Sequence, residues 1–222
     1  MEMETKDEYS NDSTISNLSD SKDSSFIFDS DDLLFIKEPN EIYPKIQSIT
    51  SILKLDCSLN LKTLSQKIKK SEMNQSNKSS SLVIKQKNSN IIINIYSNGK
   101  LICTGAKSEK EAKTNCLKIA KMIKKFGFEF NLSYYKIQNI VAHYELNFTL
   151  DLNKLYMKIC EFDINIDCKF DKKIFPGIIM NINDINITIF ESGKIVISGA
   201  KNKKDIEAIF KQIYPMINSA KT

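Results

Sequence analysis

The sequence predicts an α+β fold in which two homologous halves share one antiparallel sheet with helices on one face. Three observations predict this fold: two blocks of sequence recur, each copy has the same order of strand-like and helix-like segments, and each copy closes on an amphipathic helix. Two copies are too few for a solenoid. A single body with a pseudo-twofold axis is therefore the expected arrangement.

Two blocks of sequence carry the repeat. Residues 46–50 recur as 137–141, and residues 98–107 recur as 192–201. The copies lie 91 residues apart at the first block and 94 at the second. The chain therefore divides into an N-terminal tail, a first repeat and a second repeat, over residues 1–43, 44–134 and 135–222.

Each repeat has the same order of elements. It opens with an alternating strand, predicted at 46–57 and 137–149, and continues with a short helix after Asn60 or Asp151. These two side chains can cap their helices because their oxygens accept hydrogen bonds from free N–H groups of the first turn. A polar loop follows, at 71–80 and 161–174. Three more strands complete each half, at 82–87, 91–96 and 100–106, and at 177–182, 185–190 and 194–199.

A long amphipathic helix closes each repeat. Ser108 with Glu111 three residues later predicts a capping box at the first of these helices, and the second begins after Asn202. The apolar stripe of each helix must be buried against the sheet, which leaves the other sheet face open. The strands of that open face still carry apolar residues. An open, partly apolar face on a basic protein needs a ligand.

Charge is unevenly distributed along the chain. Residues 1–45 have a net charge of −8 and residues 46–222 a net charge of +13, and all 32 basic residues are lysine. The acidic, serine-rich tail predicts disorder, with a short apolar patch at 26–36. Two interpretations of this tail stay open. It is either a disordered segment with an apolar spot or a segment that docks on a partner or on the basic core.

Several protein classes are excluded by the sequence. The longest apolar runs are too short for a transmembrane helix, and the acidic N-terminus is unlike a secretory signal, so no membrane contact is expected. Five cysteines without a Cys-x-x-Cys pair argue against a disulfide framework or a zinc site and indicate reduced, mostly buried thiols. No motif for catalysis stands out, and Asp163 and Asp167 are interpreted as solvated. The sequence therefore predicts neither an enzyme nor a cofactor or metal, and the single histidine, His143, is given no role.

Four motifs resemble the C-terminal core of the TATA-box-binding protein family over residues 44–217. They are Gln138-Asn139-Ile140-Val141, Phe175-Pro176-Gly177, Phe190-Glu191-Ser192-Gly193-Lys194, and the paired Thr104 and Ser198 blocks, each followed by Gly-Ala-Lys. The resemblance implies a pseudo-twofold saddle with a curved ten-stranded antiparallel sheet and helices on the convex face. It implies a general transcription initiation factor that binds AT-rich promoter DNA in the minor groove, bends it and recruits the initiation machinery.

The resemblance also implies side chains that insert between base steps. In the second repeat these wedges fall on Phe175 and Phe190, and in the first repeat one falls on Tyr96. The fourth falls within Ser79–Ser81, and serine cannot act as a wedge. The kink at the second-repeat end is therefore expected to be the stronger one.

The floor of the implied DNA site departs from the family pattern. One repeat keeps Asn139 near the pseudo-dyad, whereas the other has the shorter Ser48. Polar residues also replace two family leucines. Weaker or altered TATA selectivity is expected from this floor, whose other members are Thr50, Asn94, Ile102, Thr104, Val141, Thr188, Val196 and Ser198.

Lysines supply the phosphate contacts that the resemblance implies, at Lys85, Lys100 and Lys194, although most other lysines are interpreted as solvated. For protein partners, Lys113, Lys118 and Lys121 resemble the basic helix that the family offers to other initiation factors. Asp171 and Lys173 fall in the region that resembles the transcription factor IIB contact, with Lys173 where a glutamate is usual. A homodimer in the absence of DNA is a further expectation.

Two alternatives to promoter recognition stay open. One is a decoy or scaffold that binds initiation factors after DNA binding has decayed, and the other is an architectural protein that coats AT-rich DNA. The Lys-, Ile- and Asn-rich composition without arginine indicates an AT-rich genome, such as that of a large DNA virus or a protist. The expected location is accordingly the nucleus, or a cytoplasmic viral factory or virion.

Overall fold

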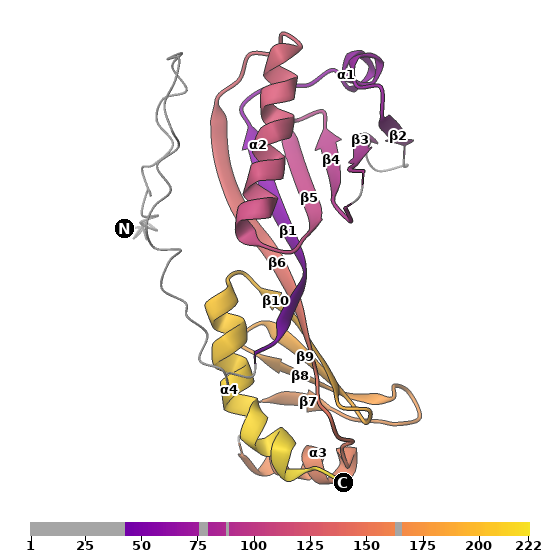
Figure 1. Ribbon diagram of the computed structural model, residues 1–222, viewed down its shortest axis with the longest axis vertical. Helices are drawn as coiled ribbons and strands as arrows, with labels where there is room; N and C mark the ends of the chain where they lie inside the picture. The colour runs from indigo at the N-terminus through magenta and orange to yellow at the C-terminus, as the bar shows by residue number, and fades with distance from the viewer. Residues whose placement is uncertain (1–42, 76–79, 88, 163–165) are drawn as a thin grey trace, which may run out of the picture. The chain divides into compact units, whose positions relative to one another are not determined.

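A single antiparallel sheet of ten strands runs through both repeats. The computed structural model describes residues 43–75, 80–87, 89–162 and 166–222 (Figure 1). The strands follow the order β2-β3-β4-β5-β1-β6-β10-β9-β8-β7, so that β1 (Lys45–Leu55) and β6 (Leu132–Glu145) join the repeats at the centre. This sheet, with its helices on one face, confirms the predicted α+β fold. The tail and its patch at 26–36 lie outside the described residues.

The other elements fill the two halves in the same order. The first repeat adds α1 (Leu61–Lys67), β2 (Ser71–Gln75), β3 (Ser80–Lys85), β4 (Ile92–Tyr96), β5 (Lys100–Ala106) and α2 (Glu109–Lys125). The second adds α3 (Leu152–Phe162), β7 (Asp167–Lys169), β8 (Gly177–Ile182), β9 (Ile185–Phe190), β10 (Lys194–Ala200) and α4 (Lys203–Ser219). No helix in this described part is long and apolar enough to cross a membrane.

The pseudo-twofold axis passes through the ladder between β1 and β6. Ile49 pairs with Ile140, and these are equivalent residues of the two repeats. On one side of this pair Thr50 pairs with Asn139, and on the other side Ser48 pairs with Val141. Ser48 is the equivalent of Asn139, and Thr50 is the equivalent of Val141, so the axis relates these two pairs to each other. Equivalent residues therefore meet at the centre of the sheet, as two copies related by a twofold axis must.

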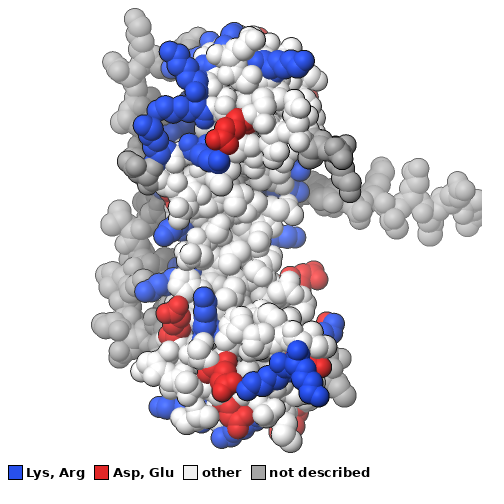
Figure 2. All heavy atoms as spheres, turned by 90° about the vertical axis from the view of Figure 1, so that its right-hand side faces the viewer, with Lys and Arg blue, Asp and Glu red and all other residues white. Residues whose placement is uncertain are grey.

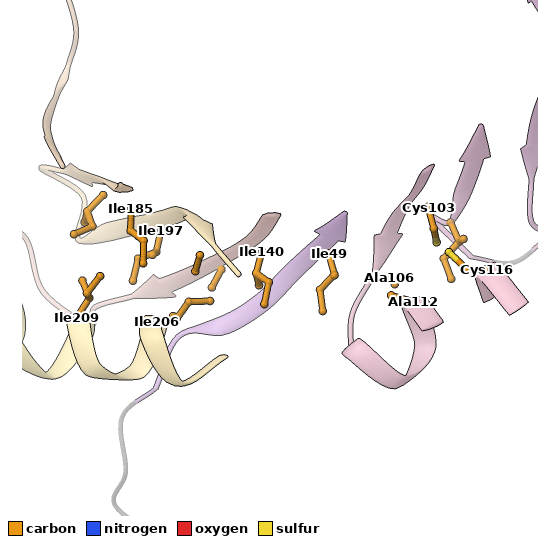
Figure 3. Close-up of a cluster of buried hydrophobic side chains, with 14 of the residues drawn as sticks. Ile49, Cys103, Ala106, Ala112, Cys116, Ile140, Ile185, Ile197, Ile206 and Ile209 are labelled. Carbon is orange, nitrogen blue, oxygen red and sulfur yellow. The ribbon is translucent and has the colours of Figure 1, made fainter. Parts of the chain in front are cut away.

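One continuous core lies between the sheet and the long helices. Helix α2 packs on β5 and β1, and α4 packs on β10. Figure 3 follows the buried side chains from Cys103 on β5 and Cys116 on α2 through Ile49 and Ile140 to Ile197 on β10, against which α4 packs. All five are fully buried. The repeats therefore share their core as well as their sheet.

Side-chain caps begin the helices as the sequence predicts. The oxygens of Asn60, Ser108, Asp151 and Asn202 accept hydrogen bonds from backbone N–H groups three residues later, at 2.9–3.1 Å. The capping box at α2 differs in one respect. The Glu111 carboxylate accepts from the N–H of Lys107 (2.8 Å), one residue before the cap.

The predicted polar loops contain the two edge strands. Residues 71–75 form β2 and residues 167–169 form β7, each paired on one side only. Edge strands this short and polar lack the alternation by which the inner strands are recognised. Strand β6 also begins at Leu132, before the predicted residue 137, and ends at Glu145.

The expectation of mostly buried cysteines holds for only two of the five, because Cys57 and Cys168 are partly exposed and Cys160 is exposed. Cys103 on β5 and Cys116 on α2 are fully buried where the helix packs on the strand, and all five cysteines are free thiols. Burial raises the pKa of Cys168 to about 11, which keeps this thiol protonated at neutral pH. Cys160 on α3 is exposed.

Phe210 is the side chain whose loss we expect to destabilise the second repeat most. It is 1% exposed, and its ring centroid lies 4.9 Å from that of Tyr144 and 5.5 Å from that of Tyr214. Phe210→Ala is expected to lower the free energy of unfolding by about 3–5 kcal/mol, because it leaves a cavity beneath α4. Urea unfolding followed by circular dichroism measures this change. A loss below about 1 kcal/mol would contradict the assigned core.

Candidate nucleic-acid interface

The sheet face turned away from α2 and α4 is not covered by any element in the described part of the chain. We call it the open face. Along most of the strands, buried residues that face the helices alternate with more exposed ones that face the open side. The structure brings two of the predicted wedges, Tyr96 and Phe190, onto the open face. It also brings all the predicted floor residues onto this face: Ser48, Thr50, Asn94, Ile102, Thr104, Asn139, Val141, Thr188, Val196 and Ser198.

Asn139 is held in one orientation at the centre of the open face. Its side-chain oxygen accepts a hydrogen bond from the backbone N–H of Gly199, at 2.7 Å. Only the oxygen of an amide can accept this bond, so its NH2 group remains as a donor. The equivalent pair is Ser48 and Gly105, and the described residues show no such bond between them. The two repeats therefore differ in the donors they offer.

Two phenyl rings meet at the second-repeat end of the open face. The centroids of Phe175 and Phe190 are 5.8 Å apart, with a 54° angle between the ring planes. Gly177 makes room for both, because a Cβ there would lie 3.1 Å from Phe175, 3.2 Å from Phe190 and 2.9 Å from the Ile189 carbonyl oxygen. A glycine at this position is thus a condition for the aromatic pair.

The first repeat has a single aromatic ring at the matching place. Ser81 pairs with Tyr96 in the same register in which Gly177 pairs with Phe190. By this register the partner of the Tyr96 ring would be Ser79, which lies outside the described residues. The aromatic contribution of the open face therefore differs between its two ends.

The predicted phosphate-binding lysines lie on strands of the open face. Lys100 and Lys194 are the first residues of β5 and β10 and directly follow Gly99 and Gly193, whose φ angles are +81° and +82°. Glycine adopts such positive φ angles without steric strain, so Gly99 and Gly193 allow the two turns that lead into β5 and β10. Lys85 instead forms an exposed ion pair with Glu72, at 3.0 Å between Nζ and Oε2.

Several charged or titratable residues of the open face were given no role from the sequence, and three of them stand opposite residues that were. Strand β6 carries His143 opposite Val196 and carries Glu145 opposite Lys194. The Nδ1 atom of His143 is buried and has no hydrogen-bond partner in the described part of the chain. On β1, Lys54 stands opposite Lys100. The alternation of each strand is the signal that places all three on this face.

The predicted partner-binding residues lie outside the open face. Lys113, Lys118 and Lys121 are exposed on α2. Asp171 and Lys173 are exposed in the segment before Phe175, where the Asp171 carboxylate accepts a hydrogen bond from the N–H of Lys173, at 2.9 Å. Asp167 lies on β7 and pairs with Lys169 at 3.7 Å, whereas Asp163 lies outside the described residues.

Comparisons with known proteins find similarity over both repeats. The model of the family described as transcription factor TFIID, or TATA-binding protein, matches residues 43–126 and 134–220. The TATA-box-binding protein of Acetabularia peniculus is 33% identical over 181 residues, 81% of this chain and 92% of that protein. TATA-box-binding protein 1 of Arabidopsis thaliana is 34% identical over 184 residues, 82% and 89% of the two chains. Among solved structures, Methanococcus jannaschii TBP is similar with a TM-score of 0.66 and 27% identity, over 80% of this chain and 99% of that one.

Proposed function

The chain belongs to the transcription factor TFIID, or TATA-binding protein, family, and from this premise we propose that it binds A/T-rich promoter DNA through the open face. Membership in this family makes the protein a transcription factor and not an enzyme. The observation that carries the proposal is the open face itself. It is an uncovered sheet surface with uncharged floor residues and an oriented amide donor at its centre and two phenyl rings at one end.

The chemistry of this face suits the minor groove of A/T-rich DNA. Both A·T and T·A present acceptors there, whereas G·C adds a protruding amino group. The Asn139 NH2 group can donate to those acceptors, and the surrounding valines, isoleucine and hydroxyls can lie against the groove floor. The amino group of guanine would collide with such a surface. Selectivity for A·T over G·C is thus expected. Ser48 and Thr50 are expected to weaken this selectivity in the first repeat.

Insertion of side chains is the proposed cause of DNA bending. Phe175 and Phe190 project together at the second-repeat end, so one kink is expected there. Tyr96 has a polar hydroxyl and no aromatic partner in the described residues, so the first-repeat kink is expected to be weaker. The TA steps of an A/T-rich site unstack at the lowest cost, which favours such sites further.

Partners and location follow as part of the proposal. The exposed lysines of α2 and the Asp171–Lys173 segment are the proposed contacts for initiation factors, including one like transcription factor IIB. We place the protein in the nucleus, and a viral factory or virion stays a prediction. The division at residues 43 and 134 and the homodimer in the absence of DNA also stay predictions.

A gel-shift comparison tests the proposed function. A TATA-containing duplex and a duplex with G·C substitutions are each titrated with the full chain at two salt concentrations. The A/T-rich duplex is expected to bind more tightly, with a log–log salt slope of about 0.9 for each phosphate neutralised. Equal affinity for both duplexes would remove promoter recognition and leave the architectural alternative. Absence of binding to either would favour the decoy.

A further inference from the structure

The two repeats carry opposite charges at one pair of equivalent positions on the open face. Lys54 of β1 corresponds to Glu145 of β6, 91 residues later. Each stands directly opposite the lysine that opens the neighbouring strand, Lys54 opposite Lys100 and Glu145 opposite Lys194. One end of the face thus has two lysines in register, and the other has a lysine and a glutamate.

The Lys54 ammonium is held at the turn that carries Lys100. It donates a hydrogen bond to the backbone carbonyl of Asn98, and the Asn98 side chain in turn accepts from the N–H of Lys100, at 3.1 Å. The ammonium has three N–H groups, so two remain for a ligand. Like charges directly opposite each other destabilise a sheet, so this pair is expected to gain most from an anion placed between them.

The matching turn of the second repeat has the same backbone and the opposite electrostatics. The backbone N–H of Gly193 donates to the backbone carbonyl of Phe190 at 2.9 Å, as the N–H of Gly99 donates to the carbonyl of Tyr96 at 3.0 Å. Glu145 cannot donate to the turn, because a carboxylate only accepts. Its charge lies across one strand spacing from Lys194, well within the screening length of about 8–10 Å, and so lowers the positive potential there.

The outer strands do not cancel this difference. Lys85 is paired with Glu72 at 3.0 Å in the first repeat, and Lys169 is paired with Asp167 at 3.7 Å in the second. Each outer pair is neutral overall, so the inner positions set the balance. On the face drawn in Figure 2, lysines dominate the upper end, formed by the first repeat, and acidic side chains are interspersed with lysines at the lower end.

We propose that Lys54 and Lys100 form a two-lysine phosphate clamp that only the first repeat possesses, and that Glu145 weakens the equivalent contact of Lys194. This inference rests on the proposed DNA binding and adds a division of roles to it. The first-repeat half holds the duplex mainly by charge, and the second-repeat half holds it mainly by its two phenyl rings. The protein accordingly has a preferred direction on an asymmetric A/T-rich site.

Salt titrations of single-lysine variants test the clamp. The probe is a duplex of about 20 base pairs with one A/T-rich core, and affinity is measured by fluorescence anisotropy over a range of salt concentrations. Lys54→Ala and Lys100→Ala are each expected to reduce the log–log salt slope by about 0.9. Lys194→Ala is expected to reduce it by less than half as much, and Glu145→Ala to increase it.

A charge swap provides the matched control. The double variant K54E/E145K keeps the net charge of the chain, so any change comes from position and not from total charge. In this background the larger slope change is expected to move from Lys100→Ala to Lys194→Ala. Equal slopes for Lys100→Ala and Lys194→Ala in the unsubstituted chain, or no exchange on swapping, would overturn the clamp. Failure of the unsubstituted chain to bind the duplex would instead overturn the proposed function.

Discussion

Phe190→Ala is expected to weaken binding to an A/T-rich duplex about 10- to 150-fold and to remove most of the bend. The Phe190 side chain is partly exposed in the free protein, so inserting it between bases would bury a phenyl group, which contributes about 1.5–3 kcal/mol. The ring also holds Phe175 in place at 5.8 Å, so its loss loosens the second wedge. Fluorescence energy transfer between dyes at the two ends of the duplex measures the bend.

Tyr96→Ala is the matched control, because Tyr96 occupies the equivalent position in the first repeat. It is expected to lower affinity less than Phe190→Ala and to leave most of the bend. Because Phe175 and Phe190 are in contact, the double alanine variant is expected to cost less than the sum of the single variants. Retention of the bend by Phe190→Ala, or a larger effect of Tyr96→Ala, would contradict the assigned wedges.

Asn139→Asp is expected to reduce DNA affinity more than 100-fold while leaving the fold intact. In the unsubstituted chain the Asn139 side-chain oxygen accepts a hydrogen bond from the N–H of Gly199 at 2.7 Å, and an aspartate oxygen can accept the same bond. It loses the two N–H donors, however, and places a negative charge against groove acceptors and phosphates. Juxtaposed like charges at an interface cost several kcal/mol. The anisotropy titration on the A/T-rich duplex measures the loss, and thermal unfolding checks that the fold is kept.

Two comparisons separate this electrostatic effect from simple loss of packing. Ser48→Ala at the equivalent position removes only a short hydroxyl, so its effect is expected to stay below about fivefold. Lowering the pH toward the carboxyl pKa of about 3.9 is expected to restore part of the affinity of Asn139→Asp, because the neutral carboxyl regains an O–H donor. A decrease no larger than that of Ser48→Ala would remove Asn139 from the proposed readout.

The repeat made most of the fold predictable from sequence. Duplicated blocks gave the equivalence of the two halves, and period-2 alternation located the eight strands other than β2 and β7. The caps at Asn60, Ser108, Asp151 and Asn202 were predictable because capping depends on local geometry alone. The edge strands β2 and β7 were not, since a short polar strand with one partner has no apolar face to reveal it.

The charged residues of the open face were harder to predict, because strand irregularities change which side chains share a face. The ladder between β1 and β6 shifts at Gln47 and again at Gln138, each of which is an extra residue in its strand. Beyond each shift the alternation reverses, so Ile46 and Ile137 pack toward the core. Counting by twos through these glutamines puts Lys45 and Lys136 on the wrong side. The opposition of Glu145 and Lys194 likewise becomes visible only with the register.

A fragment that ended before β6 would expose the full inner edge of β1, and a bare edge of that length is a template for pairing with another chain. A second copy of the fragment could cover it, with Ile49 of each copy meeting across the twofold axis. The two-repeat chain can thus be regarded as a dimer whose subunits have been fused, which removes the dependence of its assembly on concentration. Identical subunits must present the same residues at both ends of such a sheet. Fusion lifts that requirement, so phenyl rings can accumulate at one end and lysines at the other, and a symmetric scaffold becomes able to read a signal that has a direction.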